Sequence, residues 1–396
     1  STLAATTISG DGGTYSFNFA PDDGAGPLDL FVRVVATSPY ASVKPDVPGA
    51  APYAFDTAAS TGVAPGASLV VDAAAAASLP EFGVHSALAV YGTYASYLGG
   101  RNLAPIDAFY PSVRPGAHFS SGPERIELSA GHESWDVVGH EYGHYVMQAY
   151  AFVNTPGGPH SLGVGNAAAL GKAGGVGLAW SEGWATFFSL AGQVSTGYAS
   201  MGIPDVGDTK YEDQADIEST PGTGEDDELS VANVLWDLFD AAADGDDRYE
   251  ISDVALFQLA RSRLIRRVDE LWTELTPGKS PAELSRLGAL FAQAGIAPKP
   301  FLPEEDAVSD PSSPPTFAWA SNGGVSFPLN DFVIQFYSPD MTELVFEKAV
   351  GDVNAYTPTV EEWTGILASR GAVKWVVQGR NTAGPVIFLA EVLAGR

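Results

Sequence analysis

The chain has 396 residues, and its 48 acidic and 20 basic residues give a formal net charge of −28. So acidic a surface repels nucleic acids and anionic membranes, which excludes both as partners. The chain has no cysteine, which excludes disulfide bonds, zinc–thiolate sites and a cysteine nucleophile. Its hydrophobic fraction of 45% is ample for packed cores. The length of the chain favours about two or three domains. No unbroken apolar stretch approaches the roughly 18 residues of a membrane span.

Residues 1–75 have the pattern of a small β-sandwich. The stretches "GTYSFNFA" and "LDLFVRVVAT" alternate apolar and polar residues, as half-buried strands do. Clusters of Pro, Gly and Asp, such as "PDDGAGP", separate these stretches at short intervals. The start "STLAATTISG" has neither the positive charge nor the apolar stretch of a signal peptide, so we expect any such segment to have been removed.

Residues 76–299 change to a mixture of helices and strands. The stretch "SALAVYGTYASYLGG" has apolar residues at helical spacing and ends on two glycines, a common helix stop. The stretch "HFSSGPERIELSAG" returns to a strand pattern. Further helices are predicted at residues 135–152, 178–192 and 229–243. This order predicts a mixed α+β domain.

The C-terminal quarter is predicted to be a linker followed by a second β-sandwich. Residues 300–315 are rich in proline and acidic residues and poor in apolar ones, which is typical of a linker. Residues 316–396 contain evenly spaced strand patterns such as "DFVIQFYS" and "AVKWVVQGR". The predicted fold class is therefore α+β, with a mixed core between two β-sandwich domains. We expect those domains to bind glycans or surfaces, or to act as spacers, rather than to catalyse.

The stretch "GHEYGH" contains two histidines four positions apart, His140 and His144, with Glu141 beside the first. On a helix the two imidazoles lie on one face, one turn apart, so that both can reach one ion. Glu141 can then contact a water on that ion, which is the H-E-x-x-H arrangement of zinc hydrolases. Zinc lowers the pKa of its water, and the carboxylate takes the proton as the water attacks a carbonyl. The alternative interpretation is two incidental histidines on a helix.

A catalytic zinc ion usually has three protein ligands and one open position. The stretch after His144, "YVMQAYAFVN", has no histidine, which excludes a third histidine close downstream. The next candidate is Glu182 in "LAWSEGWATFFSLAG", where a lone carboxylate among aromatic residues is unfavourable unless it is paired or bound to metal. The alternative role for Glu182 is a surface or helix-capping carboxylate.

Two motifs carry a resemblance to a known family. "DVVGHEYGH" followed by "SEGWATFF" resembles the glutamate-zincin metallopeptidases, and fungalysin-like enzymes in particular. The later stretch "VANVLWDLF" is similar to the helix that follows the active site in those enzymes, and secreted bacterial proteins with flanking β-sandwich domains carry similar motifs. The resemblance covers residues 135–245. It implies a zincin-type core with zinc held by His140, His144 and Glu182, and Glu141 as the general base.

The sequence departs from the family pattern in two places. The glycine-rich stretch "PGGPHSLGVGNAAALGKAGGVG" separates the two motifs and suggests a long loop at the cleft. Fungalysin-like enzymes also carry a histidine shortly before the later helix, whereas this chain has "GTGEDDEL" there and no histidine beyond His160. Another group must then donate a hydrogen bond to the oxyanion. Tyr211 is the first candidate because a phenol donates while neutral, His160 is the second, and Tyr198 is a lesser one.

The predicted function is a secreted bacterial zinc metallopeptidase, an endopeptidase acting on protein or peptide substrates. Zn²⁺ is its predicted cofactor. The carboxylate-dense stretch "DGDDRYEISD" at residues 244–253 adds Ca²⁺ as a second, weaker candidate beside a plain solvated turn. The alternatives are a peptidase for glycosylated proteins, a surface adhesin with a structural zinc site, and an aminopeptidase. Association with the cell surface through the sandwich domains is part of the prediction.

Overall fold

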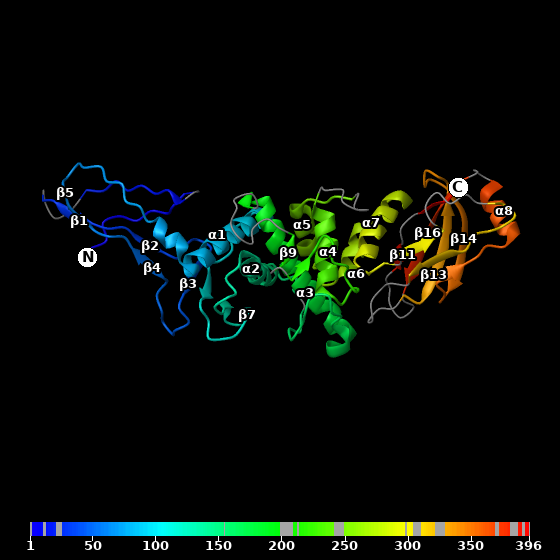
Figure 1. Ribbon diagram of the computed structural model, residues 1–396, viewed down its shortest axis with the longest axis horizontal. Helices are drawn as coiled ribbons and strands as arrows, with labels where there is room; N and C mark the ends of the chain where they lie inside the picture. Colours follow the sequence, from blue (N-terminus) through cyan, green and yellow to red (C-terminus); the bar gives the residue numbers. More distant parts are fainter. Residues whose placement is uncertain are drawn as a thin grey trace.

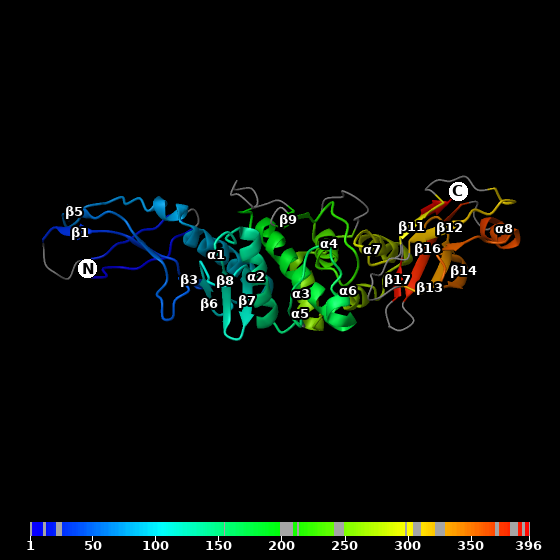
Figure 2. The ribbon, with the colours of Figure 1, turned by 60° about the horizontal axis from the view of Figure 1, so that its bottom comes forward.

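The computed structural model describes the chain except for residues 1, 11–12, 21–25, 154, 199–208, 212–213, 241–248, 298, 304–309, 321–328, 369–371, 381–386, 390–392 and 396. The molecule is elongated, with N-terminal strands at one end, a helical centre, and a C-terminal sheet at the other end (Figures 1 and 2). This mixed α+β architecture with several sheets agrees with the predicted fold class. No helix within the described residues is long and apolar enough to cross a membrane.

The N-terminal strands form two small antiparallel pairs. Strand β1 (Leu28–Leu30) pairs with β5 (Ser60–Val63), and β2 (Arg33–Val35) pairs with β4 (Ala54–Asp56). Residues 14–20, which the alternation predicts as a strand, run as irregular backbone. Each pair is a separate two-stranded sheet.

A four-stranded sheet connects the N-terminal segment to the centre of the molecule. Strand β3 (Ala41–Lys44) runs parallel to β6 (Ile106–Phe109), and β6 runs parallel to β8 (Glu124–Leu128). The last strand, β7 (Ala117–Ser121), pairs antiparallel with β8 and forms an edge of the sheet. Because β3 precedes residue 75 and its partner follows it, this sheet extends across the boundary expected there.

Seven helices make up the described part of the centre: α1 (Pro80–Gly99), α2 (Trp135–Ala149), α3 (Ala167–Ser195), α4 (Glu228–Phe239), α5 (Asp253–Arg263), α6 (Val268–Leu275) and α7 (Pro281–Gln293). A short 3₁₀ helix (Ala74–Ser78) precedes them. Helix α1 ends at Gly99, and the following residue, Gly100, has a φ of 66°, the left-handed conformation that glycine adopts readily. Helix α3 begins earlier than predicted and has a break at Gly171, where φ is 70° and ψ is 166°.

Glycines allow the central helices to approach closely. A Cβ atom on Gly143 of α2 would lie 3.1 Å from the Cα atom of Ala185 on α3. A Cβ atom on Gly183 of α3 would lie 2.5 Å from the carbonyl oxygen of Glu228 on α4. Both glycines belong to the two quoted motifs, so the same short stretches supply the chemical groups and the close helix contacts that bring them together.

The described residues of the C-terminal part form two sheets and one helix. Strands β11 (Lys299–Leu302), β12 (Phe317–Ala320) and β15 (Ala355–Tyr356) form one sheet; β14 (Leu344–Gly351), β13 (Asp331–Tyr337), β16 (Val373–Arg380), β17 (Ile387–Leu389) and β18 (Leu393–Gly395) form the other. Helix α8 (Val360–Ala368) packs beside them, and the aromatic rings of Phe317, Phe336 and Trp363 are in mutual contact. The expected linker begins in strand β11, and its residues 304–309 lie outside the described part.

Candidate metal site

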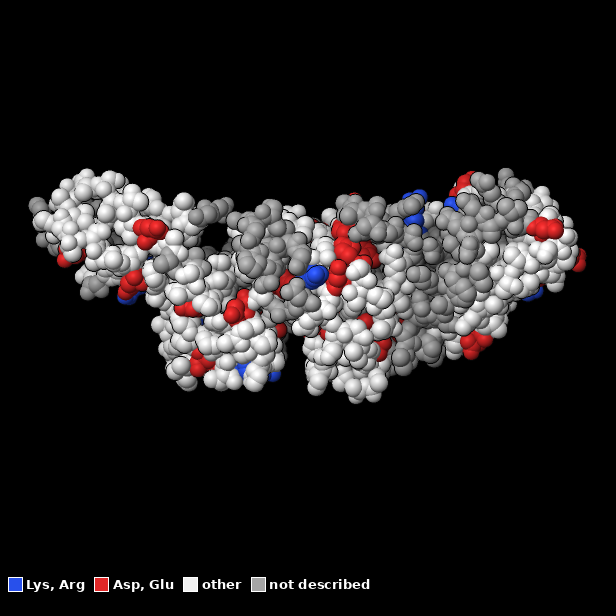
Figure 3. Space-filling model, in the orientation of Figure 1, with Lys and Arg blue, Asp and Glu red and all other residues white. Residues whose placement is uncertain are grey.

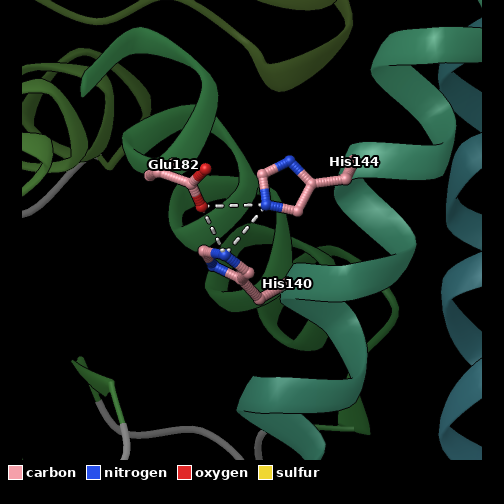
Figure 4. Close-up of side chains that lie close together, drawn as sticks. All are labelled: His140, His144 and Glu182. Atoms are coloured by element: carbon pink, nitrogen blue, oxygen red, sulfur yellow. Dashed lines mark hydrogen bonds and ion pairs between the residues drawn. The ribbon is translucent and has the colours of Figure 1, made fainter. Parts of the chain in front are cut away.

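Helices α2 and α3 bring together the three side chains that the sequence predicts as metal ligands (Figure 4). The Nε2 atoms of His140 and His144 lie 3.1 Å apart. Glu182 Oε2 lies 3.1 Å from His140 Nε2 and 2.9 Å from His144 Nε2. His140 and Glu182 are buried, and His144 is nearly so. The three donor atoms therefore point at one another from two neighbouring helices.

Two hydroxyl groups on α3 hold the far sides of the imidazole rings. Thr186 Oγ1 lies 3.1 Å from His140 Nδ1, and Ser181 Oγ lies 3.4 Å from His144 Nδ1. Thr186 is one turn after Glu182, and Ser181 directly precedes it. A hydrogen bond at one ring nitrogen orients the other toward a metal. Neither residue was predicted from the sequence, although their spacing from Glu182 on a predicted helix is a usable signal.

The geometry of the donor atoms fits a divalent metal such as zinc. Tetrahedral zinc at about 2.0–2.1 Å from each ligand separates neighbouring ligand atoms by roughly 3.3–3.4 Å, close to the distances between these donors. One carboxylate oxygen and two imidazole nitrogens are a ligand set that zinc favours. A cation at this point would also compensate the buried negative charge of Glu182.

The two histidines differ in their electrostatic surroundings. Burial lowers the pKa of His140 below its usual value. Burial acts the same way on His144, but the carboxylates of Glu182 and Glu141 outweigh it and raise the pKa of that imidazole. Burial would raise the pKa of Glu182, yet the two neighbouring imidazoles hold that pKa well below its usual range. Glu182 is thus an ionised carboxylate, as a metal ligand must be.

The three donor residues His140, His144 and Glu182 are called the triad below. Glu141, the predicted general base, is buried beside the triad on helix α2. Burial raises the pKa of Glu141 to about 7, while the positive charge at His144 and a backbone hydrogen bond from Phe119 act in the opposite direction. A pKa near neutrality suits a group that must both accept and release a proton. Phe119 belongs to the edge strand β7, and its ring lies 6.1 Å from that of Tyr145 on α2.

His160 approaches the triad from the loop between α2 and α3. Its Nε2 atom lies 3.8 Å from Glu182 Oε2, and its Nδ1 atom lies 2.6 Å from Glu228 Oε2. The hydrogen bond with Glu228 raises the pKa of His160 to about 9. Glu228 is buried at the start of α4 and was not singled out from the sequence. Its signal was its place in "GTGEDDEL", where the family pattern leads one to expect a histidine instead.

Tyr211 lies beside His140. It belongs to strand β9 (Lys210–Tyr211), which pairs with β10 (Ala215–Asp216). Its ring centroid lies 5.2 Å from that of His140. Tyr198, the lesser candidate, instead has its ring 5.7 Å from that of Trp135 at the start of α2. Residues 244–248 of the proposed calcium loop lie outside the described residues, and calcium binding there stays a prediction.

An H-E-x-x-H helix that faces a glutamate on the next helix is a candidate metal site of the type found in zinc metallopeptidases. Residues 108–282 match the family model described as the mycolysin C-terminal domain. The matched segment runs from strand β6 to the beginning of α7 and contains each site residue described above. This match relates the segment to mycolysin-type and fungalysin-type proteases, and to that extent the predicted resemblance is confirmed. Among curated proteins, none matches the chain.

Proposed function

We propose that this protein is a secreted zinc-dependent metallopeptidase that hydrolyses peptide bonds within proteins. The observation that carries the proposal is the set of three donor atoms 2.9–3.1 Å apart. The buried Glu141 directly follows His140, one of the three donor residues. His140, His144 and Glu182 are the proposed zinc ligands. The similarity of residues 108–282 to a mycolysin domain supports protein or peptide substrates.

The proposed reaction is the addition of water to a peptide carbonyl. Bound zinc would make the water more acidic and polarise the carbonyl. Glu141 accepts one proton from the water as the water oxygen forms a bond to the carbonyl carbon. Glu141 then gives that proton to the peptide nitrogen as the carbon–nitrogen bond breaks, which releases an amine and a carboxylic acid. The raised pKa of Glu141, which results from its burial, supports this role.

Two side chains are proposed as hydrogen-bond donors to the oxyanion of the tetrahedral intermediate. The ring of Tyr211 lies beside that of His140, and the imidazole of His160 lies beside the carboxylate of Glu182. A fixed donor stabilises the negative charge that develops in the transition state. Tyr211 can donate this hydrogen bond while its phenol is neutral.

We also propose the division into residues 1–75, 76–299, 300–315 and 316–396, with sandwich-like outer parts that contribute no catalytic group. The position of each described site residue between residues 140 and 228 supports this division. The strands of the outer parts would then serve in glycan or surface binding. Strand β3 is the exception, because it belongs to the central sheet.

The substitution Glu141→Gln tests the proposed function directly. The amide cannot accept a proton, so we expect kcat on casein or a fluorogenic peptide to fall by about 10²–10⁴-fold. Metal content, measured by inductively coupled plasma mass spectrometry, and melting temperature should stay near those of the parent. A chelator should abolish the parent's activity, and added zinc should restore it. A Glu141→Gln variant within tenfold of the parent would contradict the assigned base.

A further inference from the structure

Helices α2 and α3 face each other along a line of polar side chains that continues beyond the metal site. On α2 its members follow one another at intervals of one turn: Asp136, His140 and His144. On α3 they are spaced three or four residues apart, and so lie on one face: Glu182, Thr186, Ser189 and Gln193. Nearly all of these side chains are buried. We call this set of residues the polar seam.

The end of the polar seam away from the metal site is held by hydrogen bonds to Asp136. Ser189 Oγ donates to the backbone carbonyl oxygen of Asp136 at 2.8 Å. Gln193 Nε2 donates to the carboxylate oxygen Oδ1 of Asp136 at 2.6 Å. In an α-helix the same carbonyl accepts the backbone N–H of the residue four positions later, which is His140. The first turn of α2 is therefore bonded to α3 directly before the residues that carry the metal donors.

Tyr91 of helix α1 contacts the same turn of α2. Its hydroxyl donates to the carbonyl oxygen of Trp135 at 3.0 Å and accepts a hydrogen bond from Gln193 Nε2 at 3.1 Å. A Cβ atom on Gly139 would lie 2.3 Å from Tyr91 Cζ. The tyrosine ring thus packs on bare backbone of α2 next to His140, and a third helix supports the contact between α2 and α3.

These hydrogen bonds specify how far α2 lies along α3. A metal site needs ligands held within about 0.5 Å of the productive geometry. Apolar contacts alone allow facing helices to repack at little cost, because they have no preferred direction. A buried carboxylate and amide are costly to separate from each other, and buried polar groups are known to fix the register of paired helices.

We propose that Asp136, Ser189 and Gln193 are positioning residues that fix the register of α2 against α3. In this register the two imidazoles reach Glu182 before any metal binds. The inference rests on the proposed function in one respect, because it takes the triad as the metal site. The positioning residues touch neither metal nor substrate, and the buried carboxylate of Asp136 has no part in the proposed reaction.

The double variant Asp136→Leu/Gln193→Met tests this role. Both replacements are apolar and similar in shape to the original side chains, so neither partner stays buried without the other. We expect the metal-free double variant to unfold at the parent's denaturant concentration or above it. Its zinc affinity, measured by competition with a chromophoric chelator, should fall by about tenfold or more. Parental zinc affinity in this variant would overturn the inference.

Cobalt(II) in place of zinc reports the arrangement of the ligands, which a purely structural role would not change. The visible absorption of cobalt(II) depends on the number and geometry of its ligands. At saturating cobalt, the absorption band of the double variant should differ in position and intensity from that of the parent. An identical spectrum would show that the ligands converge in the same way without the bonds to Asp136.

Gln258→Met is the matched control for these measurements. Gln258 Nε2 also donates from one helix to another, to the carbonyl oxygen of Leu98 on α1 at 2.9 Å. This variant should keep the parental zinc affinity and cobalt spectrum. If it weakens zinc binding as much as the double variant does, the loss is a general effect of destabilised helix packing and the inference is wrong.

Ser189→Ala decides the question if the double variant does not fold. It removes only the hydroxyl that bonds the Asp136 carbonyl, so zinc affinity should fall while the chain stays folded, and parental affinity would contradict the inference. A parent chain that binds zinc but cleaves no peptide would contradict the proposed peptidase function instead, because the register of the two helices is measured by metal binding alone.

Discussion

The candidate site depends on single atoms whose directions are set by neighbours on the facing helix. The three donor atoms point at one another because Thr186 and Ser181 hold the outer nitrogens of His140 and His144. Without these hydroxyls the imidazole rings could rotate, and metal binding would have to fix them at an entropic cost. Small polar residues on α3 are therefore expected to influence metal affinity although they would not touch the metal.

Thr186→Val is predicted to weaken metal binding by about 10–100-fold, because it removes the hydroxyl that orients His140 and retains the branched shape. Competition with a chromophoric chelator measures this affinity. The control is Thr93→Val on helix α1, where the hydroxyl donates only to the carbonyl oxygen of Ala89 on its own helix. Unchanged metal affinity in Thr186→Val would show that packing alone orients His140.

Sequence patterns identify the predicted metal ligands of this site more readily than the residues that form hydrogen bonds with the side chains of the site. Two histidines at helical spacing and a glutamate among aromatic residues are unusual enough to be recognised from composition and spacing. Thr186 and Glu228 are ordinary residues whose roles depend on how α3 is rotated toward α2 and on where the loop after α2 ends. Those relations arise from tertiary packing, which a periodic pattern does not contain.

Close contacts between the central helices depend on glycines within the two sequence motifs. Gly183 lets the backbone of α3 approach α4, since a Cβ atom there would lie 2.5 Å from the Glu228 carbonyl oxygen and 2.6 Å from Val231 Cβ. The same contact sets the distance between Glu182 and Glu228, and hence between the triad and His160. The periodicity predicted helices α2, α3 and α4, but it did not predict the break at Gly171, because glycine alone does not reveal its φ angle.

Gly183→Ala is predicted to destabilise the protein by about 1–3 kcal/mol, because the added methyl group overlaps backbone and side-chain atoms that cannot both move away. Metal affinity should fall with it, since α3 must shift away from α4. Chemical denaturation and chelator competition measure the two effects. Gly83→Ala on α1 is the matched control: no atom lies within 4 Å of the added Cβ, so helix propensity should stabilise it by up to about 1 kcal/mol.

The whole molecule is an acidic, elongated chain with its candidate site in the central helical part. Acidic side chains are spread along the face shown in Figure 3, with few basic ones among them, in line with the net charge of −28. Composition predicted this acidic surface, and the order of strand and helix patterns predicted the α+β class. Local alternation could not assign strand β3 to the central sheet. Parallel pairing joins residues distant in sequence, here β3 and β6, and leaves no local signature.

The position of β3 predicts that two N-terminal truncations will behave differently. A chain starting at residue 76 lacks β3, whose residues Ala41 and Val43 are fully buried, and the ring of Tyr40 that packs against Gly92 of α1. It also lacks the 2.6 Å ion pair between Lys44 and Asp107. Burial of each large apolar side chain contributes about 1.5–3 kcal/mol, so this loss is a large share of a typical domain stability of about 5–15 kcal/mol.

A chain starting at residue 36 retains β3 and removes β1 and β2. We expect it to fold, to bind metal and to melt within a few degrees of the parent, whereas the chain starting at residue 76 should aggregate or melt far lower. Circular dichroism melting and metal content distinguish the two. Equal stability of both truncations would mean that the central helices fold without β3 and that the boundary expected after residue 75 is a true domain boundary. Loss of folding in both would instead show that the paired strands β1, β2, β4 and β5 are an integral part of the same folding unit.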